Sequence, residues 1–348
     1  MSKGRSKREP PLDKGLIPWL GHVLEFPKDT IKFLERMKKK HGDVLMVQLG
    51  GFYITFPQDP LSLGAFVKET PEKLDFNLFA RNLVQQLFGY RSIGNEKQIL
   101  MTTSHKHLRG AGLEVLTRAM MCNLQNVMLQ NIVSSADQTN WVEDRYSCTA
   151  RILFSGLATY PFLAMHHTTV KEEVNKVLKE SGQEVLHGGP LIHLTCDMLT
   201  KTPILDRADM TFEMADGCEY HIRKGDRMAV FPYSAFHTNP EIHPDPHSIK
   251  YDCFLNPDGS KKTDFYKAGT KVKYYNMPFG AGVSMYPGRF FANNELKQFV
   301  FLMLVYFEFE LKNPDEKIPD TDVNRLGFGA LHPIRDIQFQ YRLSNFPK

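Results

Sequence analysis

Hydrophobic residues follow a helical spacing in three segments of the chain. In residues 27–40 they alternate with lysines, and Gly42 follows closely, which predicts an amphipathic helix with a glycine stop. Residues 113–133 repeat apolar positions on one face: Leu116, Met120, Leu124, Val127 and Met128. Residues 290–306 are more apolar still and predict a buried helix: Phe291, Leu296, Phe299, Val300, Met303 and Leu304.

Paired β-rich runs predict two hairpins, each around a turn that contains glycine. The first pairs residues 43–49 with 52–56 around Gly50-Gly51. The second pairs residues 211–214 with 219–222 around Asp216-Gly217. Residues 227–232 form a further apolar run and are expected to add a strand beside the second hairpin. The chain therefore combines long helices with a smaller β-rich part.

A glycine-rich loop precedes the most apolar helical segment. Gly280, Gly282 and Gly288 let the backbone take positive φ and approach a flat ligand closely. The amides at the start of the following helix point back at this loop. With Phe279, these positions resemble the haem-ligand loop of the cytochrome P-450 family, which reads F-x-x-G-x-x-x-C-x-G. Tyr286 stands where the family has its axial cysteine.

Short blocks on both sides of the loop extend the resemblance over residues 8–160 and 200–345. Within the family they are most similar to the branch that contains sterol 12-alpha-hydroxylase and prostacyclin synthase, and closer to the sterol hydroxylase. The blocks are residues 9–15, 17–22 and 40–43 near the start, then 254–260, 264–267, 275–278, 327–329 and 341–342.

The resemblance implies an α+β fold, mainly α with a small β-sheet lobe, and a haem cofactor. The residues that match the family's cofactor positions are Phe279, Gly280, Gly282, Tyr286 and Gly288, with His107 and Arg109 where the family supplies cations to a haem propionate. Tyr286 would take the axial position on the haem iron, as tyrosine does in catalase. Two alternatives remain: Tyr286 packs in a collapsed loop, and residues 105–109 form an exposed basic turn.

Parts of the family's catalytic machinery are missing from the sequence. The axial thiolate is replaced, and residues 153–163 run almost directly into 168–174, which implies a P-450 fold lacking its central helices, including the oxygen-activating one. No E-x-x-R follows residues 202–206, and its arginine partner is replaced by Cys253. A buried arginine without its carboxylate would cost several kcal/mol, so the two losses are physically compatible. No residue is therefore assigned a catalytic role.

The resemblance implies a haem-dependent monooxygenase of the steroid 12-alpha-hydroxylase type, which acts in sterol metabolism and bile-acid biosynthesis. Because the parts named above are missing, we expect its catalytic activity to be impaired. One alternative is a non-catalytic truncated product with residual haem or lipid binding, and another is an isomerase similar to prostacyclin synthase. The implied partners are a steroid or lipid substrate and a reductase. The implied location is the cytosolic face of the endoplasmic reticulum membrane, with peripheral membrane contact by a monomer.

Length, composition and charge limit the possible domain organisation and the possible binding partners. With 348 residues and 42% hydrophobic content, the chain can bury a large core. We expect a basic, proline-containing hinge at residues 1–15, followed by one domain in two parts, residues 16–165 and 166–348. The hinge carries no membrane anchor, since no run of about 20 apolar residues occurs. A net charge of +4 is too small to indicate nucleic-acid binding.

Other site chemistries find no support in the residue pattern. The five cysteines lack the spacing of a zinc site or a disulfide framework. His237, His243 and His247 lie in a proline-rich loop and are expected to face solvent rather than a metal. No G-x-S-x-G elbow is present for hydrolysis. Without the central helices, residues 290–306 are expected to lack their cover and to leave the protein poorly stable.

Overall fold

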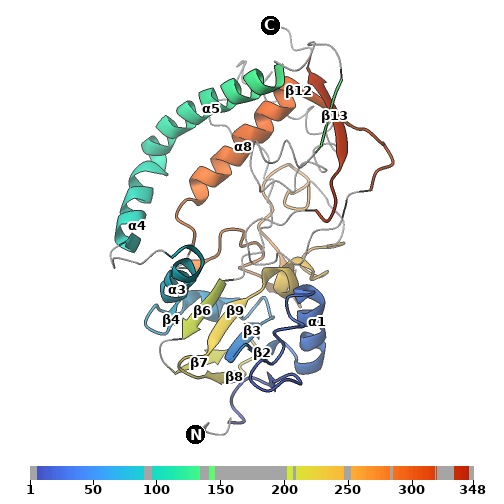
Figure 1. The fold of residues 1–348 in the computed structure, drawn as a ribbon. Helices are drawn as coiled ribbons and strands as arrows, with labels where there is room; N and C mark the ends of the chain where they lie inside the picture. Colours follow the sequence, from blue (N-terminus) through green and yellow to red (C-terminus); the bar gives the residue numbers. More distant parts are fainter. Residues whose placement is uncertain are drawn as a thin grey trace. The chain divides into compact units, whose positions relative to one another are not determined.

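The structure is a computed structural model that describes residues 6–89, 96–133, 141–145, 202–206, 209–246, 252–282, 285–317, 319 and 333–344 (Figure 1). The chain divides into two compact units. Unit 1 comprises Met1–Ile93, Asp197–Tyr286 and Val323–Leu331, and unit 2 comprises Gly94–Cys196, Pro287–Asp322 and His332–Lys348. Each unit thus combines segments that are distant in sequence.

Unit 1 is organised around a mixed six-stranded sheet with the order β1-β2-β3-β9-β6-β4. Its strands are β1 (Leu12–Asp13), β2 (Val44–Leu49), β3 (Phe52–Pro57), β9 (Arg227–Val230), β6 (Thr202–Asp206) and β4 (Leu74–Asp75). The pairs β1–β2 and β3–β9 are parallel, and the other neighbours are antiparallel. The β2–β3 hairpin turns at Gly50 and Gly51, whose φ angles are +57° and +82°, as predicted from the glycine pair.

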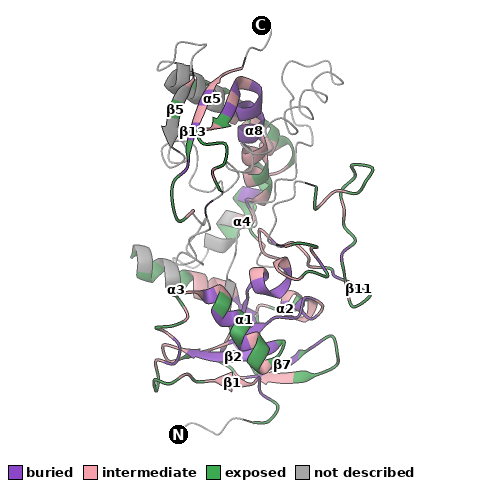
Figure 2. Cartoon of the chain, turned by 90° about the vertical axis from the view of Figure 1, so that its right-hand side faces the viewer, coloured by how far each residue is buried: buried purple, intermediate pink, exposed green. Residues whose placement is uncertain are grey.

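The first predicted helix is confirmed as α1 (Thr30–His41). Asp29 caps its start by accepting a hydrogen bond from the backbone N–H of Lys32 at 3.0 Å. Gly42 ends it at φ +90°, and its N–H donates to the carbonyl of Lys38 at 2.8 Å. Figure 2 shows buried and exposed stretches along α1, as expected for an amphipathic helix.

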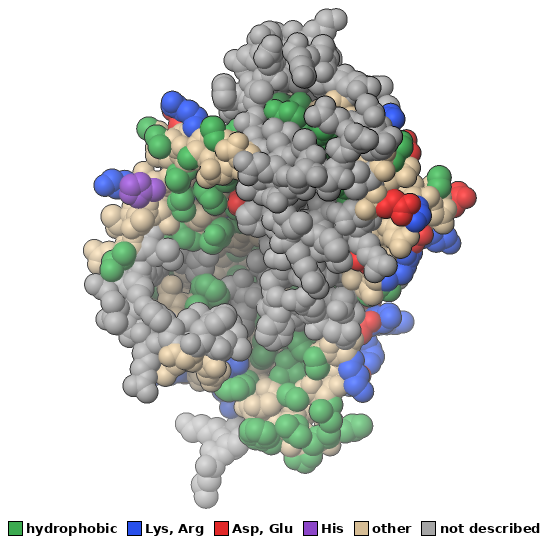
Figure 3. All heavy atoms as spheres, turned by 45° about the horizontal axis from the view of Figure 1, so that its top comes forward, with side chains coloured by type: hydrophobic (Ala, Val, Ile, Leu, Met, Phe, Trp, Pro, Cys, Tyr) green, Lys and Arg blue, Asp and Glu red, His purple; other side chains and the backbone are tan. Residues whose placement is uncertain are grey.

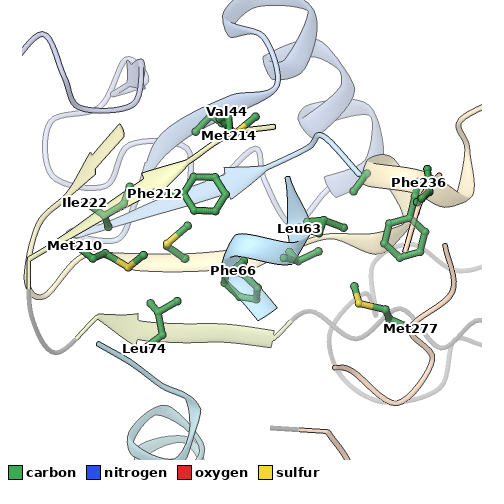
Figure 4. Close-up of a cluster of buried hydrophobic side chains, with 14 of the residues drawn as sticks. Val44, Leu63, Phe66, Leu74, Met210, Phe212, Met214, Ile222, Phe236 and Met277 are labelled. Carbon is green, nitrogen blue, oxygen red and sulfur yellow. The ribbon is translucent and has the colours of Figure 1, made fainter. Parts of the chain in front are cut away.

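Hydrophobic cores cover both faces of the unit 1 sheet. Adjacent residues Val44 and Leu45 of β2 belong to different cores, because successive side chains of a strand point to opposite faces. The core that contains Leu45 includes the buried side of α1, with Phe33, Leu34 and Met37. The core that contains Val44 joins α2 (Leu63–Lys68) to the hairpin of β7 (Met210–Glu213) and β8 (Glu219–Ile222); Figure 4 shows Leu63, Phe66, Phe212, Ile222 and Phe236 in it.

The β7–β8 hairpin confirms the second predicted hairpin, but the strand expected beside it lies elsewhere. β9 pairs with β3 and β6 in the large sheet, whereas β7 and β8 form a sheet of their own. Unit 1 also contains α3 (Phe76–Phe88), the short π-helix η1 (Tyr233–His237) and the strand pair β10 (Tyr266–Lys267) and β11 (Thr270–Lys271).

Unit 2 is built on long helices and a three-stranded sheet. Its helices are α4 (Glu96–His107), α5 (Gly110–Val133) and α8 (Arg289–Tyr306), and its antiparallel sheet has the order β12-β13-β5, with β12 Phe307–Leu311, β13 Gln338–Leu343 and β5 Val142–Arg145. The side chains of Asn294 and Gln298 on α8 both donate hydrogen bonds to Thr117 of α5. The two helices therefore pack side by side, as Figure 1 shows.

The expectation that the last long helix lacks its cover is wrong for its C-terminal half. Every residue from Gln298 to Val305 is buried, with exposed fractions of 5% or less. The apolar residues at consecutive positions are enclosed on all sides of the helix, as in a core helix. The buried half of α8 therefore gives no reason to expect a poorly stable protein.

The helices and small sheets agree with the predicted α+β class. Residues 163–169, at the first expected junction, and residues 207–208, within the gap expected after Asp206, lie outside the described residues, so the absence of central helices stays a prediction. None of the described helices is long and apolar enough to cross a membrane.

Gly21 holds the segment before α1 against the β2–β3 hairpin and is expected to tolerate no side chain. At its φ of +61° a Cβ atom would collide with the backbone of Gln48, 2.7 Å from the carbonyl carbon. We expect Gly21→Ala to lower the free energy of unfolding by well over the roughly 1–2 kcal/mol of the left-handed backbone alone. Gly217→Ala is the matched control, because Gly217 has φ +83° and nothing within 4 Å of its Cβ position. Equal urea midpoints for both variants would contradict the collision.

Candidate functional site

Residues 279–282 and 285–286, the described part of the loop, fold closely together in unit 1. Gly280 and Gly282 have φ angles of +71° and +65°, which a side chain rarely adopts. The N–H of Tyr286 donates to the carbonyl of Phe279 at 3.0 Å, and the N–H of Met285 donates to that of Gly282 at 3.2 Å. The backbone of this loop is therefore folded back on itself around the predicted glycines.

Gly282 is also fixed by its neighbour in space. A Cβ at Gly282 would collide with the backbone carbonyl of Val67 in α2 and lie 3.2 Å from the Val67 side chain. Glycine at this position thus serves the contact with α2 as well as the turn. The match to the family pattern at Gly282 therefore has a physical cause in this chain.

The ring of Tyr286 stacks on the ring of Phe279, with 6.1 Å between centroids and 21° between planes. Tyr286 still keeps 52% of its surface exposed. The side chain at the family's ligand position thus packs against one side of its loop and presents its other side to the surroundings.

Unit 2 contains two arginines beside Phe290 in the first turn of α8: Arg109, just before α5, and Arg289. The guanidinium carbon of Arg109 lies 5.1 Å from the ring centroid of Phe290, and that of Arg289 lies 4.4 Å from it. Burial lowers the pKa of Arg289, and the positive charge of Arg109 lowers it further. Two cations therefore share one aromatic ring and repel each other.

Arg109 has an incomplete set of partners. Its Nε atom is buried and has no hydrogen-bond partner in the described part of the chain. An unsatisfied buried donor costs about 1–3 kcal/mol, and the N-terminus of α8 adds positive potential. A bound anion, such as a carboxylate, would offset both costs. The arrangement at Arg109 and Arg289 therefore fits a haem propionate.

The structure separates His107 from this arrangement. His105, Lys106 and His107 form the exposed last turn of α4, so the expected basic turn is helical at these residues. Arg109 follows in the short break before α5, and its guanidinium group lies over the ring of Phe290. Gly288 is the N-cap residue of α8, and its carbonyl accepts from the N–H of Ala292 at 3.0 Å.

Arg289 was missed by the interpretation of the sequence. A detectable signal was its position as the first residue of a helix, where a cation opposes the positive end of the helix dipole. A charge placed against the dipole indicates that another group, such as an anionic ligand, compensates it. Sequence alone did not bring Arg109 and Arg289 together, because they are far apart in the chain.

The loop histidines are more enclosed than expected. Burial lowers the pKa of His237 to about 4, so its imidazole is neutral at physiological pH. His243 packs on the rings of Phe254 and Phe265, and its Nε2 lies 3.3 Å from the carbonyl oxygen of Tyr275. The prediction that these two histidines face solvent is therefore wrong, while His247 lies outside the described residues. No group of His, Cys, Asp and Glu in the described ranges could hold a metal ion.

Comparison with known proteins identifies the family. Residues 202–340 match the family model described as Cytochrome P450. The human 7-alpha-hydroxycholest-4-en-3-one 12-alpha-hydroxylase is 33% identical over 99% of this chain and 95% of its own length. Human prostacyclin synthase is 30% identical over 97% of this chain and 95% of its own length. Pig cytochrome P450 7A1 is 29% identical over 98% of this chain and 95% of its own length. Because the human 12-alpha-hydroxylase is 33% identical and the alignment covers both chains almost completely, this chain belongs to the cytochrome P450 family.

Proposed function

We propose that this chain is a haem-binding protein of the sterol 12-alpha-hydroxylase type whose monooxygenase activity is impaired. The observation that carries the proposal is Tyr286 in a preserved haem-ligand loop, at the position of the family's axial cysteine. The identity to the human 12-alpha-hydroxylase is higher than that to prostacyclin synthase and favours a sterol ligand over isomerase chemistry.

In each unit, taken by itself, residues at the family's haem positions offer groups that a haem requires. In unit 1, Gly280 and Gly282 allow backbone amides to approach the ring, Phe279 offers an aromatic face and Tyr286 a phenol oxygen. In unit 2, Arg109 and Arg289 offer guanidinium groups to a propionate, and Gly288 begins α8. Bound haem would supply redox-active iron for oxygen chemistry in the family reaction, with a steroid as substrate and a reductase as electron donor.

The same residues argue against efficient oxygen insertion. A thiolate pushes electron density onto the iron and favours O–O cleavage, and a phenolate does so less. Cys253 stands in place of the arginine that joins the family's E-x-x-R ion pair, and it is exposed. The alignment with the human 12-alpha-hydroxylase spans 474 positions, more than the 348 residues of this chain, which supports an internally shortened catalytic domain.

The second candidate function is a non-catalytic protein with residual lipid or haem affinity. The stacking of Tyr286 on Phe279 favours it, because a ring engaged in packing is less available to iron. This candidate shares the proposed location at the cytosolic face of the endoplasmic reticulum membrane, with peripheral contact by a monomer. Steroid hydroxylation by the haem-loaded chain with a reductase separates the two functions, because only the first allows product above background.

Substitution of Arg109 tests the propionate assignment. We expect Arg109→Gln to weaken haem affinity about tenfold or more, because a hydrogen bond to a charged group contributes about 1.5–3 kcal/mol. Arg118→Gln is the matched control, since Arg118 is an exposed arginine of α5. Haem uptake is measured by absorbance titration at fixed salt concentration. Equal affinities for the wild type and both variants would refute the role of Arg109.

A further inference from the structure

Arg227 stands in the interior of the unit 1 sheet. As the first residue of β9, it is paired with Ile54 of β3 on one side and with Leu205 of β6 on the other. Side chains alternate along a strand, so Arg227 and Ala229 point to the same face of the sheet, and Ala229 belongs to the core that includes α1. The sheet thus places a cation at the border of an apolar core.

Two aromatic rings hold the guanidinium group of Arg227. Its central carbon lies 3.5 Å from the ring centroid of Phe52 in β3 and 5.9 Å from that of Phe79 in α3. Figure 1 shows α3 beside β6, the strand next to β9. An arginine stacked on aromatic rings keeps one orientation, so its planar fork is preorganised for a ligand.

The positive charge of Arg227 is not compensated within the described part of the chain. Its Nε atom is buried without a hydrogen-bond partner there, and no carboxylate of the described residues stabilises its charged form. Burial lowers the pKa of Arg227, because desolvation disfavours the charged form. The residue is nevertheless partly exposed, so an anion can approach the guanidinium group from the open side.

One carboxylate stands in the same row of the sheet as Arg227. Asp75 of β4 pairs with Leu205, two strands away from Arg227, which is a separation of roughly 10 Å. Asp75 caps α3, because its carboxylate accepts from the backbone N–H of Asn77 at 2.8 Å. Asp75 therefore serves the start of α3, and the charge of Arg227 remains for an external anion.

The surroundings of Arg227 offer apolar contacts as well as charge. Phe52 is 47% exposed, and Phe79 is partly exposed. Phe79 also lies beside Phe76, with 6.4 Å between the two ring centroids. Figure 3 shows hydrophobic side chains at the surface in the lower part of the view, with lysines and arginines beside them. A ligand with an anionic group on a rigid apolar body matches this combination.

We propose that Arg227 binds the carboxylate or sulfate group of an anionic steroid, whose apolar body lies against Phe52 and Phe79. A guanidinium fork binds such oxyanions through two parallel hydrogen bonds, and an uncharged hydroxyl cannot accept both. The inference rests on the sterol function proposed above and names the chemical class of the ligand. An arginine that only stabilises the fold would give no preference between charged and uncharged steroids.

A matched pair of steroids tests the proposal without a need for activity. Chenodeoxycholate carries a carboxylate on its side chain, and its methyl ester has the same rings without the charge. Equilibrium dialysis below the micelle concentration measures the binding of each to the full chain. We expect the carboxylate to bind about tenfold or more tightly than the ester, with a preference that falls as salt concentration rises. Equal affinities for the two steroids would overturn the proposal.

Substitutions of Arg227 locate the bound anion. We expect Arg227→Gln to lower the affinity for the carboxylate to that for the ester. Arg227→Lys keeps the charge without the planar fork, so it should retain part of the preference and guards against a folding defect in the glutamine variant. The control Lys224→Gln removes an exposed cation shortly before β9 and should leave both affinities unchanged. A preference that persists in a folded Arg227→Gln, or that is undiminished in Arg227→Lys, would contradict the proposed fork.

Two further measurements separate the steroid assignment from its alternatives. Dodecanoate carries the same anionic group on a flexible chain and is expected to bind more weakly than chenodeoxycholate. Equally tight binding of dodecanoate through Arg227 would show a site for any anionic amphiphile and would refute the steroid assignment. Haem uptake is measured on the same preparations. A carboxylate preference without haem uptake would refute the proposed haem function alone, and haem uptake without the preference would refute this inference alone.

Discussion

The reduced chain exposed to carbon monoxide is expected to lack the absorption band that reports a thiolate on haem iron. Tyr286 occupies the ligand position, and a phenol cannot supply the sulfur. Among the described cysteines, Cys122, Cys218 and Cys253 are exposed and lie outside the loop from Phe279 to Tyr286. The measurement is a reduced carbon-monoxide difference spectrum of haem-loaded protein. A clear thiolate-type band would show that another cysteine reaches the iron.

The matched substitution Tyr286→Cys extends this prediction. It is expected to introduce the thiolate-type band, because the surrounding loop keeps the family's glycines and phenylalanine. Steroid hydroxylation is nevertheless expected to stay at background, since the E-x-x-R pair and the central oxygen-activating helix are absent from the sequence pattern. Product formation well above background by this single substitution would show that the missing parts are not required.

Truncation of a buried α8 side chain is expected to be the most destabilising single change. Phe301 is 1% exposed in the enclosed half of the helix. Phe301→Ala should lower the free energy of unfolding by about 3–5 kcal/mol through lost burial and an unfilled cavity. Such a loss is a large part of the roughly 5–15 kcal/mol available to a typical domain. Chemical denaturation monitored by circular dichroism measures it.

The control for this experiment is Ile99→Ala in α4, because Ile99 is 54% exposed and its truncation should cost little. A similar small effect of both substitutions would mean that α8 is not packed as described. It would also restore the expectation of an uncovered helix that follows from the sequence pattern alone.

Local patterns predicted the local structure well. Gly42 ends α1 with its N–H on Lys38, and the glycine pairs form the expected hairpins because these turns depend on residues adjacent in sequence. The apolar run after Gly288 is α8, which begins at Arg289, one residue before the predicted start. Periodicity and turn chemistry act over a few residues, so they can be interpreted without the fold.

Features that depend on distant partners could not be predicted in the same way. β9 pairs with β3 and β6 rather than with the neighbouring hairpin, since strand partners are chosen by the packing of the whole sheet. His237 is enclosed because η1 belongs to the core of unit 1, which a proline-rich loop sequence does not reveal. The approach of Arg109 and Arg289 to Phe290 likewise depends on how α5 packs on α8.

The central claim is that this cytochrome P450 family member binds haem, with Tyr286 and Arg109 at the positions of the family's haem contacts. Titration of the purified wild-type chain with haem, beside Tyr286→Phe and Arg109→Gln, tests it most directly. The account predicts saturable uptake of one haem per chain by the wild type, with altered ferric absorbance in Tyr286→Phe and weaker binding in Arg109→Gln. Uptake that does not saturate, or that is identical in all three proteins, would contradict it.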